Sequence, residues 1–196
     1  MREPANQDGS LAPLAALSID IFGRRRRIGF LHLLVILFWW RGTPRALALI
    51  RLGQHFHLTG WRLLRRWLEE ALRRDYGCFV QPGAVIGPGL RLPHPMGIVI
   101  GRGARVGAGC IIYHQVTLGG ARTGDGRAAR YPRVGGEVTI FAGAKLIGAI
   151  SVGEGATVGA NAVVNRDVPA GHVAAGAPAR SRPAPALAGD LELLEG

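Results

Sequence analysis

The stretch VGGEVTIFAGAKLIGAISVGEGATVGANAVVNRDV, residues 134–168, repeats with a period of six residues. An aliphatic residue opens each repeat, and a small or apolar residue follows four positions later. This period fits neither the helical period of about 3.6 residues nor the alternation of a half-buried strand. It is the hexapeptide pattern of a parallel β-helix, in which each repeat supplies one short strand and one corner and three repeats complete a coil.

The same pattern continues toward the N-terminus and predicts which side chains are buried. Residues at the first position are expected to point into the prism and those at the fifth to fill its corners, while glycine relieves the backbone at turns. The expected first-position residues are Val80, Ile86, Leu92, Ile100, Val106, Ile112, Leu118, Val134, Ile140, Leu146, Val152, Val158 and Val164. The expected fifth-position residues are Ala84, Leu90, Met96, Ala104, Cys110, Val116, Val138, Ala144, Ile150, Ala156, Ala162 and Val168. The sequence therefore predicts a mainly β protein with a parallel β-helix over residues 78–180.

The register of the repeat breaks at two places, and breaks in a regular scaffold are where functional groups concentrate. Two extra residues stand between Leu92 and Ile100, around Pro93-His94-Pro95. A longer, polar and Gly-rich insertion separates Leu118 from Val134 and is expected to protrude as a loop.

The part of the chain before the repeat has a helical pattern. Residues 28–77 are expected to form a short α-helical region, residues 1–27 a loosely ordered basic N-terminus, and residues 181–196 a C-terminal tail. Within the helical region, an apolar face is expected to pack against neighbouring helices; it consists of Trp61, Leu64, Trp67, Leu68 and Leu72.

Positive charge is concentrated in the N-terminal part, because residues 1–77 hold thirteen of the arginines that produce the net charge of +11. A run of four arginines from Arg24 leads into an apolar run ending at Trp40, shorter than the ~20 residues of a membrane-spanning helix. We interpret residues 24–40 as a buried or interfacial helix that contacts a membrane surface. A secretory signal, cleaved near Ala46-Leu47-Ala48, is the alternative. No nucleic-acid-binding motif accompanies the arginines, so nucleic acid is not an expected partner.

Two histidines near the register breaks are the candidate general bases. His94 stands between two prolines, which restrict the backbone and direct the ring away from the packed coil. His114 lies just before the long insertion. A β-helix offers no deep pocket of its own, so a site built on either imidazole is expected in a groove beside a loop or between subunits.

Several motifs of the repeat region resemble the bacterial serine O-acetyltransferase family over residues 76–180. They are Gly97-Ile98-Val99-Ile100-Gly101, Tyr113-His114-Gln115-Val116-Thr117-Leu118-Gly119-Gly120, Ala142-Gly143-Ala144-Lys145, Gly159-Ala160-Asn161-Ala162-Val163-Val164, Asp167-Val168-Pro169 and Gly176-Ala177-Pro178-Ala179-Arg180. The resemblance implies a left-handed β-helix, a homotrimer, acetyl-CoA as co-substrate without a metal, and transfer of acetyl to the hydroxyl of L-serine. It also implies that His94 is the general base and that the groove for CoA is lined by Gly119, Gly120, Ala142, Lys145 and Arg180. Because acetyl-CoA chemistry belongs in the cytosol, we expect a cytoplasmic protein, peripheral at the inner membrane face.

The chain departs from that family where the acceptor would bind. The family places an Asp directly before its catalytic His, where this chain has Pro93, and a second Asp some fifteen residues earlier, where it has Phe79. The family's loop ends in Arg-His-Pro, whereas this chain has Arg130 and Tyr131 followed by proline, which we expect to face the acceptor.

These departures leave two further hypotheses open: a sugar or exopolysaccharide O-acetyltransferase with the same donor site, and a non-catalytic β-helix scaffold. A zinc hydratase needs three His ligands meeting at a subunit interface. Only His94 and His114 lie in the repeat region before residue 170, so we do not expect a metal site.

Overall fold

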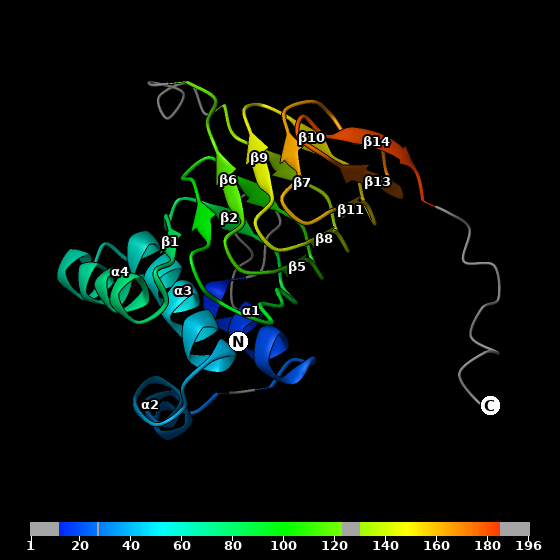
Figure 1. Ribbon diagram of the computed structural model, residues 1–196. Coiled ribbons are helices and arrows are strands. Elements are labelled where there is room, and N and C mark those ends of the chain that lie inside the picture. The colour runs from blue at the N-terminus through cyan, green and yellow to red at the C-terminus, as the bar shows by residue number, and fades with distance from the viewer. Residues whose placement is uncertain (1–11, 27, 123–129, 185–196) are drawn as a thin grey trace, which may run out of the picture.

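The computed structural model describes residues 12–26, 28–122 and 130–184. Four helices precede a series of short strands (Figure 1). The helices are α1 (Pro13–Phe22), α2 (Phe30–Phe38), α3 (Thr43–Leu58) and α4 (Arg62–Tyr76). The strands are β1 (Phe79–Val80), β2 (Val85–Ile86), β3 (Val99–Ile100), β4 (Arg105–Val106), β5 (Ile111–Ile112), β6 (Thr117–Gly119), β7 (Arg133–Val134), β8 (Thr139–Ile140), β9 (Lys145–Ile147), β10 (Ser151–Val152), β11 (Thr157–Val158), β12 (Val163–Val164), β13 (His172–Ala175) and β14 (Arg180–Pro183).

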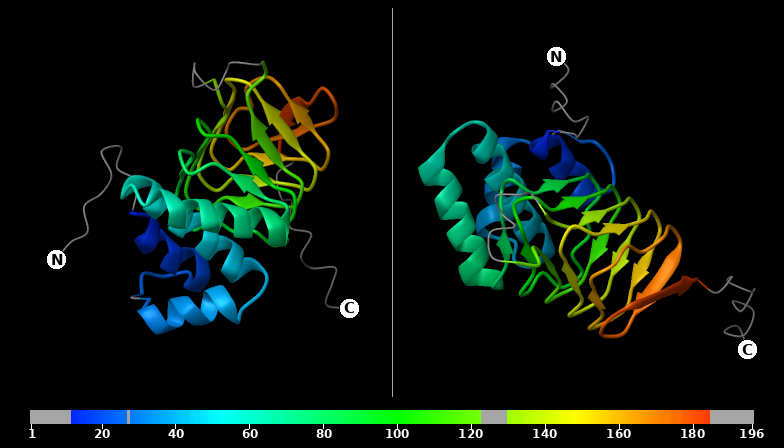
Figure 2. Two further views of the ribbon diagram at one scale, coloured as in Figure 1. Left: turned by 90° about the vertical axis from the view of Figure 1, so that its left-hand side faces the viewer. Right: turned by 90° about the horizontal axis from the view of Figure 1, so that it is seen from above.

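The strands form the three walls of a prism, and from β1 to β13 consecutive strands belong to different walls (Figures 1 and 2). Sheet 1 has the order β1-β3-β6-β9-β12, sheet 2 the order β10-β7-β4-β2, and sheet 3 the order β14-β13-β11-β8-β5. All pairs are parallel except β13 with β14. The mainly β, left-handed parallel β-helix preceded by helices is therefore confirmed.

The interior of the prism is filled as the six-residue period predicts. Every expected first-position residue is buried, and ladders such as Val80, Ile100, Leu118, Leu146 and Val164 stack in register in sheet 1. The fifth-position assignment is wrong only at Met96, whose side chain is 62% exposed. Ile98, which is 1% exposed, takes that place because the two extra residues move the corner along the chain.

The helical region covers the N-terminal end of the prism (Figure 2). The expectation that residues 1–27 are loosely ordered is wrong for 13–22, which form α1: Leu17 is buried in the hydrophobic core, and Ala16 is buried as well. Residues 1–11, Arg27 and residues 185–196 of the expected tail lie outside the described part of the chain. The triplet Ala46-Leu47-Ala48 is buried within α3.

The expected packing of the α4 stripe is only half right. Leu68 and Leu72 are buried, but Trp61 and Trp67 are 65% and 47% exposed, and Leu64 is also exposed. One edge of α4 packs on α3 and β1, whereas the exposed Trp61 ring makes only a tilted contact with Phe56 of α3, with centroids 6.4 Å apart. Apolar periodicity therefore predicted the helix correctly, but only part of the predicted apolar face is buried.

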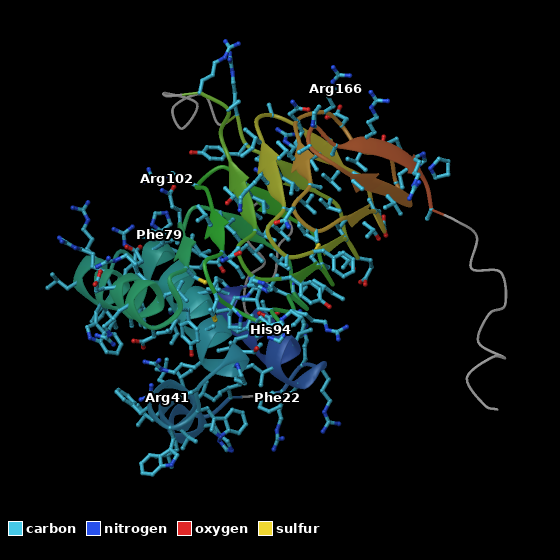
Figure 3. All side chains as sticks on the ribbon, in the orientation of Figure 1. Phe22, Arg41, Phe79, His94, Arg102 and Arg166 are labelled. Carbon is cyan, nitrogen blue, oxygen red and sulfur yellow. The ribbon has the colours of Figure 1, made fainter. Side chains whose placement is uncertain are left out.

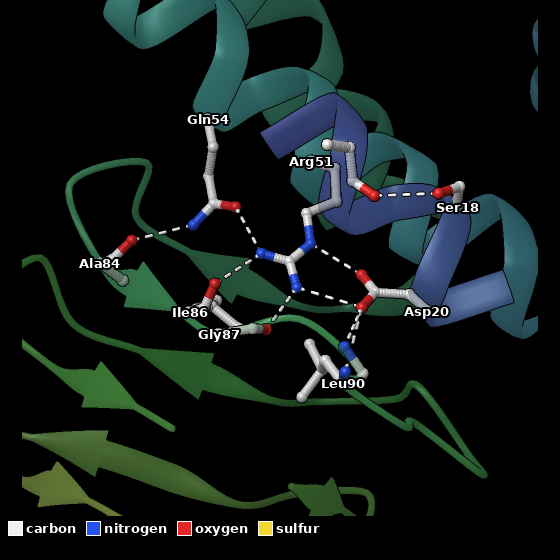
Figure 4. A network of polar contacts seen from close by, with 10 residues as sticks. Ser18, Asp20, Arg51, Gln54, Ala84, Ile86, Gly87 and Leu90 are labelled. Carbon is white, nitrogen blue, oxygen red and sulfur yellow. Dashed lines mark hydrogen bonds and ion pairs between the residues drawn. The ribbon is translucent and has the colours of Figure 1, made fainter. Parts of the chain in front are cut away.

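A buried polar network joins the helices to the first coil (Figure 4). Arg51 of α3 pairs with Asp20 of α1 and donates hydrogen bonds to two backbone carbonyls of the coil, those of Ile86 and Gly87. Gln54 donates to a third carbonyl, that of Ala84. Within the described residues, no single helix is long and apolar enough to cross a bilayer; α2 and α3 reach the required length only as a pair bent by 117°.

Candidate active site

The corner where the chain passes from sheet 3 to sheet 1, here called the His94 corner, gathers a cluster of rings. The centroid of the His94 ring lies 6.0 Å from that of His114 and 6.3 Å from that of Tyr113. Tyr113 in turn stacks on Phe141 of the next coil, with centroids 5.2 Å apart. The two candidate bases named from the sequence thus lie at one site.

His94 is held at the surface by contacts on both sides of its segment. Thr43 Oγ1 at the start of α3 donates to the Leu92 carbonyl over 2.7 Å, and the Gly97 amide donates to the Tyr76 carbonyl over 2.9 Å. Pro95 is buried, while His94 itself is exposed (Figure 3). The backbone around the ring is therefore fixed, and the ring faces solvent, where a substrate can reach it.

His114 lies one coil further and is more enclosed. Its Nδ1 atom is buried and has no hydrogen-bond partner among the described residues. A buried polar atom without a partner is unfavourable, so this nitrogen is a strained feature of the corner. The next residue, Gln115, adopts a left-handed backbone with φ of 58°.

Two of the residues expected to bind CoA also reach the His94 corner. Lys145 lies one coil above, pairs in register with Thr117, and donates a hydrogen bond from Nζ to the Gln115 carbonyl. Ala142 occupies the same corner, where its carbonyl accepts a hydrogen bond from the Asn161 amide. The corner therefore combines an exposed imidazole with a cationic side chain.

The remaining site residues lie elsewhere. Gly119, Gly120, Arg130 and Tyr131 lie where the chain passes from sheet 1 to sheet 2, here called the Tyr131 corner. Arg180 is exposed on β14, at the far end of the prism from the helices. Residues 123–129 of the expected loop lie outside the described residues. Within one chain, the width of sheet 1 therefore separates the residues of the His94 corner from those of the Tyr131 corner.

Tyr131 packs tightly against the Tyr131 corner. A Cβ atom added at Gly101 or Gly103 would lie 2.2 Å or 2.4 Å from atoms of its ring. Arg102, between these glycines, borders a groove of about 390 Å³ between α4 and β1 that is also lined by Phe79 and Gln81. Figure 3 shows Arg102 and His94 at different edges of the prism. Tyr131 and Arg130 therefore do not contact His94 within one chain.

No carboxylate supports the candidate bases within the described residues, where neither ring of His94 and His114 has a hydrogen bond or ion pair with an acidic side chain. Pro93 and Phe79 stand at positions where the family that this chain resembles has aspartates, and both side chains are exposed. Nor does any group of three or more His, Cys, Asp or Glu side chains in this part of the chain come together as metal ligands.

The stacked aromatic side chains of the His94 corner, Tyr113 and Phe141, were not predicted from the sequence. Tyr113 and Phe141 both directly follow an inward-pointing isoleucine, a position that glycine occupies in most of the other repeats. Two aromatic residues at that position in adjacent coils are a signal for a flat surface at one corner, because the coils stack in register.

Comparison with known proteins finds serine acetyltransferases among the relatives of this chain. No family model matches the chain. The serine acetyltransferase of Helicobacter pylori strain J99 is 43% identical over 136 residues, which cover 69% of this chain and 78% of the relative. A soybean serine acetyltransferase solved in complex with serine has a TM-score of 0.66 and 36% identity, covering 71% of this chain and 56% of its own. A serine acetyltransferase solved in complex with CoA has a TM-score of 0.66 and 29% identity, covering 87% of this chain and 67% of its own. With this extent of sequence and structural similarity, the chain belongs to the serine acetyltransferase family.

Proposed function

We propose that this protein is an acetyl-CoA-dependent serine O-acetyltransferase, which moves the acetyl group of acetyl-CoA to the hydroxyl of L-serine. The observation that carries the proposal is the His94 corner, where an exposed imidazole on a fixed segment lies beside His114, and where Lys145 donates a hydrogen bond to the Gln115 carbonyl. The family supports the choice of substrates, since its relatives have been solved with serine and with CoA.

In the proposed reaction, His94 acts as the general base. A serine hydroxyl hardly ionises near neutral pH, so a base must take its proton as the oxygen attacks the thioester carbonyl. The C–O bond forms, the C–S bond breaks, and the proton passes to the sulfur, giving O-acetylserine and CoA. The edge-on contact with His114 and the tilted contact with Tyr113 orient the ring in place of a carboxylate.

We further propose that the active site is completed between copies in a homotrimer. One observation supports this arrangement: the residues expected to bind acetyl-CoA are divided between the two corners, with Ala142 and Lys145 at the His94 corner and Gly119 and Gly120 at the Tyr131 corner. A trimer would bring the Tyr131 corner of one copy to the His94 corner of the next. Gly119, Gly120 and Arg180 would then line the CoA groove, with Arg130 and Tyr131 facing the acceptor.

A sugar hydroxyl is the second candidate acceptor, and a specific observation favours it. Serine carries an ammonium group that a carboxylate recognises well, yet Pro93 and Phe79 offer no charge and Tyr131 replaces the family's loop His. A sugar hydroxyl needs the same base and the same donor groove without the ammonium partner.

The test is release of CoA thiol from acetyl-CoA by the full chain, measured with L-serine and with a panel of sugars and nucleotide sugars. Turnover with L-serine and none with sugars supports the primary proposal, whereas the reverse supports the second candidate. If acetyl-CoA binds in calorimetry and no acceptor is consumed, the acceptor lies outside both classes. If CoA does not bind at all, the protein is a scaffold and the proposed function is wrong.

We also propose a cytoplasmic location, peripheral at the inner face of the membrane. Two observations support it: the proposed co-substrate is a cytosolic metabolite, and α2 carries exposed apolar side chains beside arginines. Cell fractionation that recovers the protein with the membrane, and releases it by high salt without detergent, would agree with this location.

A further inference from the structure

Helix α2 and the residues after it expose large apolar side chains to solvent. The exposed fractions are 75% for Leu31, 66% for Phe38 and 85% for Trp39, and Val35 and Trp40 are exposed as well. Leu31, Val35 and Phe38 follow the spacing of one helix face. The other side of α2 is also apolar, since Ile36 is buried in the core of the helical region. Helix α2 is therefore apolar on two sides, and the rest of the chain covers only the side that carries Ile36.

The exposed face, here called the α2 patch (Leu31, Val35, Phe38, Trp39 and Trp40), lies at the end of the molecule. In Figure 2 (left view), α2 lies across the end of the helical region that is most distant from the prism. In the proposed homotrimer, with its axis along the prism, all three patches would face the same way. Three weak contacts with one flat surface would then form together, which raises the overall affinity for that surface although no single contact becomes stronger.

The charge around the α2 patch has a single sign. From Ile21 to Leu68 the sequence contains ten arginines and no aspartate or glutamate. Arg24, Arg25 and Arg26 before α2 and Arg41 after it are exposed. Nearby acidic groups are already engaged: Asp20 is buried against Arg51, and Asp75 pairs with Arg45 and Arg74. Among the described residues, the patch therefore offers apolar side chains bordered by exposed arginines that form no ion pair with an acidic side chain.

We propose that the α2 patch docks on the surface of an anionic phospholipid bilayer. Leu31, Val35, Phe38 and Trp39 would enter the boundary between headgroups and acyl chains, and the flanking arginines would contact lipid phosphates. Tryptophan is enriched at this depth of a bilayer, and basic residues strengthen binding to anionic lipid. The inference deepens the proposed peripheral location and rests on it, but it does not depend on the proposed chemistry.

The charges favour lipid over a second copy of this chain as the occupant. If two α2 patches paired face to face, the arginines that flank each would approach those of the other, and like charges at an interface are unfavourable. A spanning arrangement is also disfavoured, because the nine residues of α2 are about half of the ~20 that the hydrocarbon core requires.

The test is flotation of the full-length protein with vesicles of phosphatidylcholine, with and without phosphatidylglycerol. We expect binding to the anionic vesicles only, reversed by high salt because the arginine contacts are electrostatic. The double variant Phe38→Ser/Trp39→Ser should bind at least about tenfold more weakly. The triple variant Arg24→Gln/Arg25→Gln/Arg26→Gln should lose the preference for anionic lipid.

Matched control variants separate the α2 patch from general effects. Leu63→Ser removes an equally exposed apolar side chain on α4, and Arg166→Gln removes an exposed arginine on the prism (Figure 3). Both should bind vesicles like the parent protein, and all variants should retain acetyl transfer in lipid-free solution. The proposal is overturned if anionic vesicles do not bind the parent protein or if Leu63→Ser weakens binding as much as the patch variant. It is also overturned if Phe38→Ser/Trp39→Ser changes the mass of the assembly in light scattering, since the occupant is then a second copy.

Discussion

Arg51 of α3 and Asp20 of α1 form a fully buried ion pair, with Arg51 Nε and Asp20 Oδ2 2.7 Å apart (Figure 4). The carboxylate also accepts hydrogen bonds from the backbone amides of Gly89 and Leu90. A β-helix has an open end, where the first coil has no preceding coil to pair with its backbone groups. The ion pair closes that end by replacing the missing coil with side chains from the helices.

Replacing Arg51 with methionine should therefore destabilise the protein strongly. The change leaves the Asp20 carboxylate buried without its cation, a loss of about 3–5 kcal/mol in the free energy of unfolding. Urea denaturation followed by circular dichroism measures it. Arg73→Met, which removes an exposed pair with Glu70, serves as the control and should change stability far less. Equal effects of the two variants would contradict the capping role.

Replacing Val152 with aspartate should also destabilise the fold. Val152 is buried in the prism and pairs in register with Val134, so the new carboxylate would have no water and no partner. We expect a loss of about 3 kcal/mol or more, measured as a lower denaturation midpoint. Glu154→Ala, at an exposed position two residues later, should leave the midpoint nearly unchanged. A folded Val152→Asp protein of parent stability would mean that this position faces solvent.

Replacing His94 with alanine should abolish most turnover while leaving acetyl-CoA affinity almost unchanged. A positioned general base typically contributes ~10²–10⁴ in rate, and its loss affects the chemical step more than donor binding. Steady-state kinetics and calorimetry separate the two quantities. His57→Ala, at an exposed residue of α3, is the control. Full activity of His94→Ala together with an inactive His114→Ala would transfer the role of base to His114.

Replacing Lys145 with glutamate should weaken acetyl-CoA binding by about tenfold or more, since an anion would face the phosphates of the donor. Lys145→Met removes the charge and the hydrogen bond to the Gln115 carbonyl without adding repulsion, and should have a smaller effect. Arg62→Glu makes the same charge reversal at an exposed site on α4, away from both corners. If the control variant weakens acetyl-CoA binding equally, the effect of Lys145→Glu comes from the overall charge of the protein, and Lys145 does not line the groove.

The two cysteines should be unreactive in the folded protein. Burial raises the pKa of the Cys78 thiol and that of the Cys110 thiol above the ordinary value. A raised pKa lowers the fraction of thiolate at neutral pH, and thiolate is the reactive form. Labelling with dithiobis-nitrobenzoate should be slow until denaturant is added. A new exposed cysteine, Ala160→Cys, should react at once, and rapid labelling of the parent protein would contradict the burial.

The repeat pattern of the sequence predicts the candidate site only in part. His94 could be selected because a break in the repeat and two prolines mark its position. The repeat also marks the positions of Tyr113 and Phe141, but it does not give their contacts, because the placement of Tyr113 beside His94 depends on how coils of unequal length stack. For the same reason Met96, and not Ile98, was expected inside: the position of two extra residues within a corner depends on how the corner closes.

The six-residue period is sufficient to specify the prism, because each inward position repeats the same burial and a shift of register would expose every aliphatic side chain together. The helical region has no such constraint. An apolar stripe on a helix has the same pattern whether it meets a neighbouring helix, another copy or a bilayer. Burial of Leu68, exposure of Trp61 and Trp39, and the pairing of Arg51 with Asp20 therefore follow from the three-dimensional placement of α1 to α4 against the first coil. Burial and long-range ion pairing depend on residues distant in the chain, whereas periodicity is a property of residues close together in it.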